Sequence, residues 1–126
     1  DLDDPAIRDQ LERTESAVLA TVNRSTKPWF RPPFGGLDDQ IPAVVGSAGW
    51  GYTVLWDVDT IDWRPEVDGG PTASDIVDKV VENAQGGSIV LMHLGGFNTF
   101  EALPDIVAGL RAMDLEPVTL GEMFGS

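Results

Sequence analysis

The chain has no cysteine and a single histidine among its 126 residues. The absence of cysteine excludes disulfides, zinc–thiolate sites and a thiol nucleophile. A single histidine also excludes a zinc site made of three nitrogen or sulfur ligands. The longest apolar runs, such as residues 88–92, are far too short to span a bilayer, so we expect no membrane insertion.

Basic residues are scarce as well: 8 Lys and Arg stand against 21 Asp and Glu, for a net charge of −13. Because Lys and Arg supply most of the affinity for nucleic-acid phosphates, this balance excludes nucleic acid as a partner. It also disfavours binding to an anionic membrane surface. The length and an apolar fraction of 42% are typical of one packed domain, and we interpret residues 1–126 as such.

Segments with helical periodicity alternate with short extended segments. We predict strands at 29–31, 53–56, 88–92 and 116–119, with a helix before, between and after them. No hairpin signal occurs, so the alternation predicts an α/β fold of parallel strands joined by crossover helices. Four such strands are half of an eight-stranded (β/α) barrel.

The predicted helices have recognisable ends and apolar stripes. Asp4 with Pro5 favours a helix start, and Asp38 or Asp39 is expected to cap the second helix. The residues expected to face inward, in chain order, are Ile7, Leu11, Val18, Val22, Ile41, Val44, Val45, Ala48, Ile76, Val77, Val80, Val81, Ala84, Leu103, Ile106, Val107, Leu110 and Met113.

Polar residues follow three of the predicted strands. They are the segments 31–35 and 57–63, and His93. Ligands of parallel α/β folds bind beyond the carboxyl ends of the strands, so we expect these residues on one rim. Each has an ordinary structural explanation by itself, as a surface charge, a helix cap or a hydrogen-bonded strand end. Their joint placement favours a function.

The residue types suit acid catalysis. An aspartate hydrogen-bonded to one nitrogen of His93 would fix which ring nitrogen faces a substrate. Arg31 can orient a second carboxylate, and the stiff backbone after Pro32 and Pro33 can offer an N–H group to an oxyanion.

Two other classes fit less well. A glycoside hydrolase would need a carboxylate pair from Asp57, Asp59 and Asp62, but neighbours in one loop rarely face each other across a sugar. A phosphorylation-receiver domain would need a lysine after a late strand, whereas Lys27 and Lys79 follow no predicted strand.

Three segments together resemble successive motifs of one family. They are Arg-Pro-Pro-Phe-Gly at 31–35, Trp-Asp-Val-Asp-Thr-Ile-Asp-Trp at 56–63 and Ile-Val-Leu-Met-His at 89–93. In order and spacing they resemble the polysaccharide deacetylases, the NodB-homology domains of carbohydrate esterase family 4. The resemblance covers essentially the whole chain. It implies the C-terminal half of a distorted (β/α) barrel.

The resemblance implies three catalytic roles. His93 would be the general acid that protonates the departing amine, and Asp62 would pair with it. Arg31 would position a catalytic-base aspartate that this chain does not contain.

The resemblance also implies substrate contacts. The backbone near Phe34, with Pro33 and Gly35, would bind the substrate and its developing oxyanion. Trp63 would form a wall of the sugar groove, and Leu91 would line the pocket for the acetyl methyl group.

Members of the family remove N- or O-acetyl groups from chitin, peptidoglycan or xylan with a zinc-type divalent metal. The two earlier motifs that would supply the metal ligands are absent here, so we expect those ligands outside this chain and expect the chain alone to be inactive. The expected partners are an acetylated polysaccharide and either the missing N-terminal half or a second copy covering the exposed strand edge. The expected location is the bacterial cell envelope or the exterior. The alternative is a non-catalytic, degenerate relative that only binds glycan or another protein.

Overall fold

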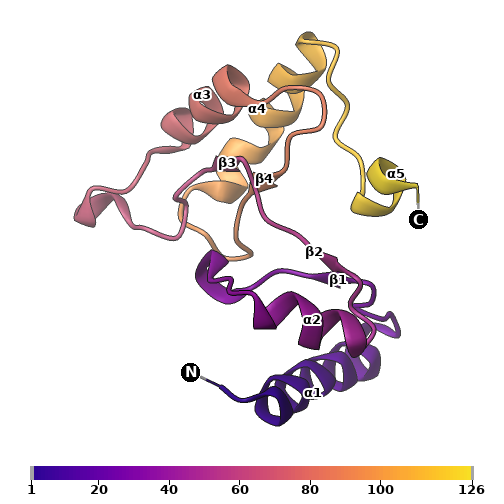
Figure 1. Ribbon diagram of the computed structural model, residues 1–126. Coiled ribbons are helices and arrows are strands. Elements are labelled where there is room, and N and C mark those ends of the chain that lie inside the picture. Colours follow the sequence, from indigo (N-terminus) through magenta and orange to yellow (C-terminus); the bar gives the residue numbers. More distant parts are fainter. Residues whose placement is uncertain (1, 126) are drawn as a thin grey trace. The chain divides into compact units, whose positions relative to one another are not determined.

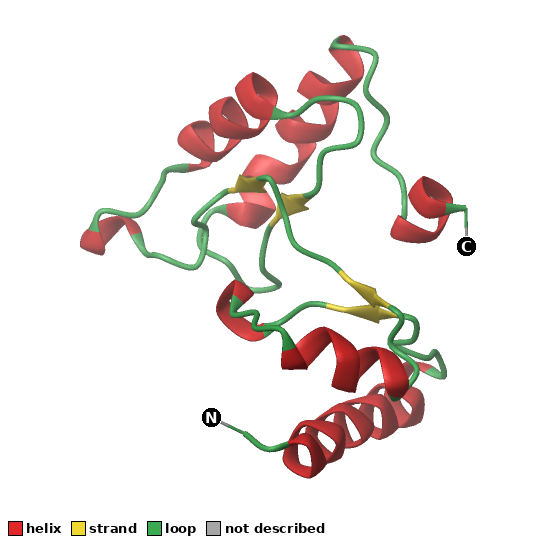
Figure 2. Cartoon of the chain, in the orientation of Figure 1, coloured by secondary structure: helices red, strands yellow, loops and turns green. Residues whose placement is uncertain are grey.

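The computed structural model describes residues 2–125, which form two compact units. The first unit ends at Leu55 and the second begins at Trp56. Each unit has its own helices and its own pair of short parallel strands (Figures 1 and 2). In the described part of the chain, no helix has the length and apolarity needed to cross a membrane.

The first unit is a long helix followed by a strand–helix–strand segment. Its elements are α1 (Asp4–Val22), β1 (Trp29–Phe30), a 3₁₀ turn (Pro33–Gly35), α2 (Gln40–Ser47) and β2 (Tyr52–Thr53). The strands β1 and β2 are parallel, with Trp29 opposite Tyr52. Because α2 connects them, the predicted crossover arrangement is confirmed in this unit.

Aspartate side chains begin both helices of the first unit. Asp3 Oδ1 accepts a hydrogen bond from the Ala6 N–H group at 3.0 Å, so the cap lies one residue before the predicted Asp4. This register puts Pro5 in the first turn of α1, where its missing N–H group needs no partner. Asp38, rather than Asp39, receives the first N–H groups of α2.

The core of the first unit lies under α2. Val44, Val45 and Trp50 are buried there, which confirms the predicted face of α2. On α1 the prediction for Val22 is wrong, because this side chain is 57% exposed. Val22 is the last residue of the helix, and the chain leaves it through Asn23 in the left-handed conformation.

The second unit contains two short strands, three helices and a 3₁₀ turn. Its elements are β3 (Val58–Asp59), the 3₁₀ turn (Glu66–Asp68), α3 (Ala73–Asn83), β4 (Val90–Leu91), α4 (Thr99–Ala112) and α5 (Leu120–Phe124). The strands β3 and β4 are parallel, with Asp59 opposite Leu91, and α3 connects them. Figure 1 shows α3 and α4 side by side next to this strand pair.

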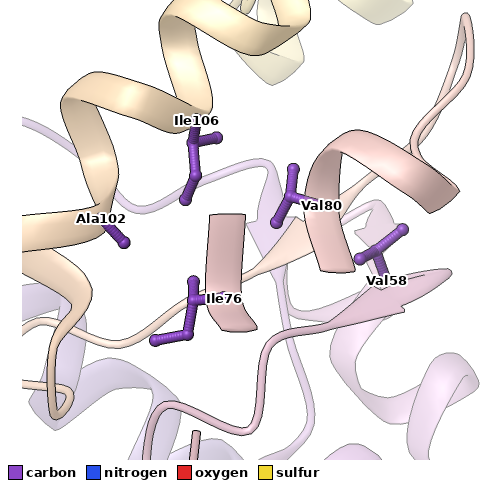
Figure 3. Close-up of a cluster of buried hydrophobic side chains, with 5 residues drawn as sticks. All are labelled: Val58, Ile76, Val80, Ala102 and Ile106. Atoms are coloured by element: carbon purple, nitrogen blue, oxygen red, sulfur yellow. The ribbon is translucent and has the colours of Figure 1, made fainter. Parts of the chain in front are cut away.

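The core of the second unit joins β3, α3 and α4. Figure 3 shows its five buried side chains, which are Val58, Ile76, Val80, Ala102 and Ile106. The predicted stripe of α3 is thus confirmed at its centre. Leu103 on α4 and Met113, which follows its last residue, are 43% and 40% exposed, so their predicted inward orientation is wrong. The apolar side of α4 is wider than the face that α3 covers, which is centred on Ala102 and Ile106.

The predicted strand at 53–56 is also wrong in its bounds, because β2 ends at Thr53 and β3 begins only at Val58. Asp57 therefore precedes a strand instead of following one. Its carboxylate accepts hydrogen bonds from the Ser88 hydroxyl and the Ile89 N–H group, both at 2.6 Å, and so joins the amino ends of the two strand segments.

Residues 116–119, predicted as a last strand, form no strand in the structure. Glu116 accepts hydrogen bonds from the Arg111 guanidinium, and Pro117 has no N–H group to donate to a neighbouring strand. Thr119 caps α5 together with Glu122. Of the backbone N–H groups that a strand would use, Pro117 therefore lacks one, and that of Thr119 donates to Glu122 Oε2 at 2.9 Å.

Candidate functional site

Asp62 and His93 lie side by side at the carboxyl ends of β3 and β4. The two strands are parallel neighbours in register, so the residues that follow them reach the same edge. Asp62 follows β3 and His93 follows β4, and their side chains are in direct contact. Both residues were predicted to lie on a common rim, and in this unit they are in contact.

The Asp62 carboxylate is fully buried and receives three hydrogen bonds. Its Oδ1 atom lies 2.6 Å from Nδ1 of His93. Its Oδ2 atom accepts from the His93 backbone N–H group at 2.8 Å and from the Thr99 hydroxyl at 2.6 Å. A buried charge is tolerated when it is hydrogen-bonded in this way.

These contacts determine the charge of the pair. Burial raises the pKa of Asp62, but the hydrogen bonds from Thr99 and His93 outweigh it and hold the pKa below its usual value. The carboxylate is therefore ionised at neutral pH, and Nδ1 of His93 must carry a proton to donate to it. The side chain of His93 is 34% exposed, so Nε2 is the ring nitrogen left for exchange with another molecule.

The turn after β3, which leads to Asp62, has an unusual backbone conformation. Ile61 has φ 58°, which is rare for a β-branched residue. Asp59 Oδ1 accepts from the Ile61 N–H group at 2.9 Å, and the buried Thr60 donates its hydroxyl to the Leu91 carbonyl at 2.9 Å. Asp59 therefore serves the turn, which disfavours it as half of a glycosidase carboxylate pair.

The loop after β4 approaches the Asp62 carboxylate closely. The Phe97 N–H group donates to the Asp62 carbonyl at 2.6 Å, and a Cβ atom on Gly96 would lie 2.4 Å from both Asp62 Oδ2 and Thr99 Oγ1. Gly96 and Thr99 are not among the predicted site residues. Thr99 is 37 residues from Asp62, and no local pattern connects the two.

The other predicted site residues of the second unit differ in exposure. Trp63, next to Asp62, is 57% exposed, so its ring can contact another molecule. Leu91 is buried at 7% exposure within β4. Their substrate contacts remain predictions.

In the first unit, Arg31 follows β1 and the next residues form a tight turn. Arg31 is exposed, and Phe34 is in the left-handed region at φ 57° with its side chain fully exposed. The N–H group of Gly35 donates to the Pro32 carbonyl and that of Gly36 to the Pro33 carbonyl. Within the described part of this unit, the Phe34 N–H group donates to no carbonyl.

A pocket of about 610 Å³ opens beside this turn. Its lining is mainly apolar and includes Trp29 and Trp50 together with Arg31 and Pro33. The segment predicted to bind substrate thus borders a cavity within its own unit.

The described residues do not fit a zinc-type metal. Within residues 2–125, no three side chains of His, Cys, Asp or Glu are grouped so that they could hold a metal ion. The single His93 already uses Nδ1 for Asp62. This donor set lacks the three protein ligands that a catalytic zinc site requires.

No family model matches the chain, but individual relatives do. It is 38% identical over 86 residues to chitin deacetylase 2 of Saccharomyces cerevisiae, covering 67% of this chain and 27% of that protein. It is 37% identical over 100 residues to a peptidoglycan-N-acetylglucosamine deacetylase of Bacillus cereus, covering 75% of this chain and 44% of that protein. The chain thus spans less than half the length of these curated relatives.

Solved structures agree over nearly all of the chain. A carbohydrate esterase family 4 pseudoenzyme from Bacillus anthracis matches with a TM-score of 0.84 and 30% identity, over 97% of this chain and 41% of that one. A family 4 carbohydrate esterase from Streptomyces lividans in complex with acetate matches with a TM-score of 0.81 and 28% identity, over 94% of this chain and 58% of that one. The α/β fold of parallel strands therefore matches the barrel of this family over the aligned region.

Proposed function

This chain belongs to the polysaccharide deacetylases of carbohydrate esterase family 4, and from this premise we propose that it takes part in hydrolysing N- or O-acetyl groups of a polysaccharide, with His93 as the general acid. The observation that carries the proposal is the contact between a buried, ionised Asp62 and Nδ1 of a partly exposed His93. Chitin and peptidoglycan are the substrates named for the relatives, and xylan is a third candidate.

The proposed step is the collapse of the tetrahedral intermediate. The C–N bond breaks, its electron pair moves to the nitrogen, and that nitrogen takes the proton from Nε2 of protonated His93. The imidazole is left neutral, with its Nδ1 proton still donated to Asp62. The negative charge of Asp62 stabilises the imidazolium before the transfer and fixes the ring orientation. For an ester the same proton goes to the departing oxygen.

We propose that the metal site lies outside this chain. A zinc-type ion would activate the attacking water, but residues 2–125 do not provide its site. We place its ligands, and the base aspartate, in polypeptide other than this chain. The complementing part of the domain is then the protein partner, and the chain alone is expected to release no acetate.

The first unit has proposed roles of its own. Arg31 positions the base aspartate, and the Phe34 N–H group, flanked by Pro33 and Gly35, stabilises the oxyanion. The absence of an acceptor for the Phe34 N–H group within its unit supports the second role, since an oxyanion donor must be unoccupied before the substrate binds. In the second unit, Trp63 forms a wall for the sugar and Leu91 lines the methyl pocket.

The acidic balance fits a glycan that is neutral or cationic, because like charges repel. Peptidoglycan is the substrate named for several relatives, so we place the protein outside the cytoplasm, in the bacterial cell envelope or secreted.

The test is a chimera in which this chain replaces the aligned part of the Bacillus cereus deacetylase. We expect the chimera to release acetate from chitin oligomers with added zinc, and His93→Gln to lower the rate at least about 100-fold. Equal rates in the two chimeras would refute the role of His93. Rapid turnover by the isolated chain would refute the placement of the metal site.

A second candidate is a non-catalytic glycan-binding or interaction domain. The similarity to a family 4 pseudoenzyme favours it, since that structure matches this chain as well as the esterase does. A folded chimera that binds chitin oligomers but releases no acetate with either residue at position 93 would support this candidate.

A further inference from the structure

We infer that Thr99 is a positioning residue for the Asp62–His93 pair, and that Gly96 is small so that the Thr99 hydroxyl can reach Asp62. The inference rests on the proposed function, because it assigns what orients the general acid.

The hydrogen bonds of the carboxylate show why a third residue is needed. Oδ1 of Asp62 faces the ring of His93, while Oδ2 takes the His93 backbone N–H group and the Thr99 hydroxyl. Without Thr99, His93 would be the only residue that donates to the two carboxylate oxygens, although His93 is the residue that Asp62 is proposed to orient. The Thr99 hydroxyl is the one anchor of this carboxylate that comes from α4.

Thr99 does not act as an ordinary helix cap. Thr72 and Thr119 do: each precedes its helix, accepts from the third helical N–H group and bonds the carboxylate three residues on. Thr99 is instead the first residue inside α4, and its hydroxyl reaches a carboxylate 37 residues away. The preceding Asn98 donates its side-chain N–H groups to Glu66 and to the Pro71 carbonyl. The Thr99 bond is therefore tertiary.

Gly96 supplies the space for this bond. A Cβ atom there would lie 2.4 Å from Asp62 Oδ2 and equally close to Thr99 Oγ1. A Cβ atom does not approach a nonbonded oxygen that closely, so any larger residue would displace one of the two oxygens. The short bond between them, 2.6 Å, depends on the bare glycine.

The experiment uses the whole chain and needs no turnover. His93 is the only histidine, so its Nδ1 proton gives one assignable NMR signal. We expect Thr99→Val to speed exchange of this proton with water at least about tenfold, because a hydrogen bond to a charged group is lost. We also expect the pKa of Asp62, followed by its carboxyl carbon, to rise toward its usual value. Thr99→Ser keeps the hydroxyl and should restore both readouts.

Thr72→Val is the matched control, since it removes a hydroxyl–carboxylate bond of 2.7 Å elsewhere in the same unit. It should leave both readouts unchanged. Unchanged readouts in Thr99→Val, or equal changes in Thr72→Val, would overturn the inference. If the valine variant does not fold, Thr99→Ala decides by the same readouts. Failure of the acetate-release test would disprove the proposed function and leave these signals unaffected.

Discussion

Among residues 2–125, each unit has one buried carboxylate that is held by hydrogen bonds, Glu15 in the first and Asp62 in the second. The two differ in their partners. Oε1 of Glu15 accepts from the Ser25 hydroxyl at 2.6 Å, and Oε2 accepts from the Thr26 N–H group at 2.7 Å and from its hydroxyl at 2.5 Å. These bonds lower the pKa of Glu15, as the bonds from Thr99 and His93 lower that of Asp62 despite its burial.

The two carboxylates differ in the chemistry of the side chains that they bind. The Thr26 hydroxyl that binds Glu15 also accepts from Trp50 Nε1 at 2.9 Å, so that network ends in the core. Asp62 instead binds Nδ1 of His93, whose ring is partly exposed and keeps its second nitrogen, Nε2, for another molecule. Burial and a lowered pKa therefore do not identify a functional carboxylate. The presence of a partly exposed partner with proton-transferring nitrogen atoms does.

The largest expected difference is in catalysis. In the chimera, Asp62→Asn should lower acetate release at least about 100-fold, because the amide no longer fixes the Nδ1 proton of His93. Glu15→Gln makes the same chemical change in the other unit and should leave the rate per folded molecule unchanged. Initial rates of acetate release measure both. Similar losses in the two variants would remove the distinction between the carboxylates.

The next effect is on stability. Asp62→Asn should lower the free energy of unfolding of the second unit by about 2 kcal/mol, because its buried donors lose a charged acceptor. His93→Gln should cost less than about 1 kcal/mol, since this side chain is partly exposed. Urea titrations followed by amide signals of the second unit measure both. A His93 variant as unstable as the Asp62 variant would make the pair a structural one.

Acid should affect both units in the same direction. Each carboxylate has a pKa below its unfolded value, so its stabilising effect is complete above that value and is lost as the pH falls through the folded one. We expect the stability that these two carboxylates contribute to be complete down to about pH 5 and to be lost below about pH 4. In Asp62→Asn the loss in the second unit should be smaller. An unchanged loss of stability at low pH in that variant would contradict the lowered pKa of Asp62.

The smallest effects come from glycines. Gly96→Ala should destabilise the second unit by about 1 kcal/mol through its clash with Asp62 and Thr99. Gly46→Ala, in α2 with open space around it, should stabilise the first unit by about 0.5 kcal/mol. Thermal unfolding of each variant gives the sign. Stabilisation by Gly96→Ala would disprove the close approach.

Much of the fold could be predicted from local pattern. The stripe of α3 and the parallel order depend on periodicity and alternation, and both were correct. The predicted orientation of Leu103 failed because periodicity shows which side of α4 is apolar but not how much of that side α3 covers. That of Met113 failed because α4 ends at Ala112. The predicted strand at 116–119 failed because Pro117 has no N–H group to pair and the α5 cap uses the N–H group of Thr119.

The site was predictable only in part. Asp62 and His93 came from motifs that follow strands, and parallel pairing explains why they meet. Thr99 and Gly96 were missed because their partner is distant in sequence, and a threonine or glycine near a helix start has common local explanations. Asp57 was predicted to follow a strand because no local sequence pattern marks the break between β2, which ends at Thr53, and β3, which begins at Val58.

The central claim is that ionised Asp62 holds a proton on Nδ1 of His93 and leaves Nε2 for proton transfer. A long-range ¹H–¹⁵N spectrum of the isolated chain tests it directly, because the sequence has one histidine. We predict that neutral His93 carries its proton on Nδ1 and that Asp62→Asn abolishes this preference. A neutral ring protonated on Nε2 in the unmodified chain would contradict it.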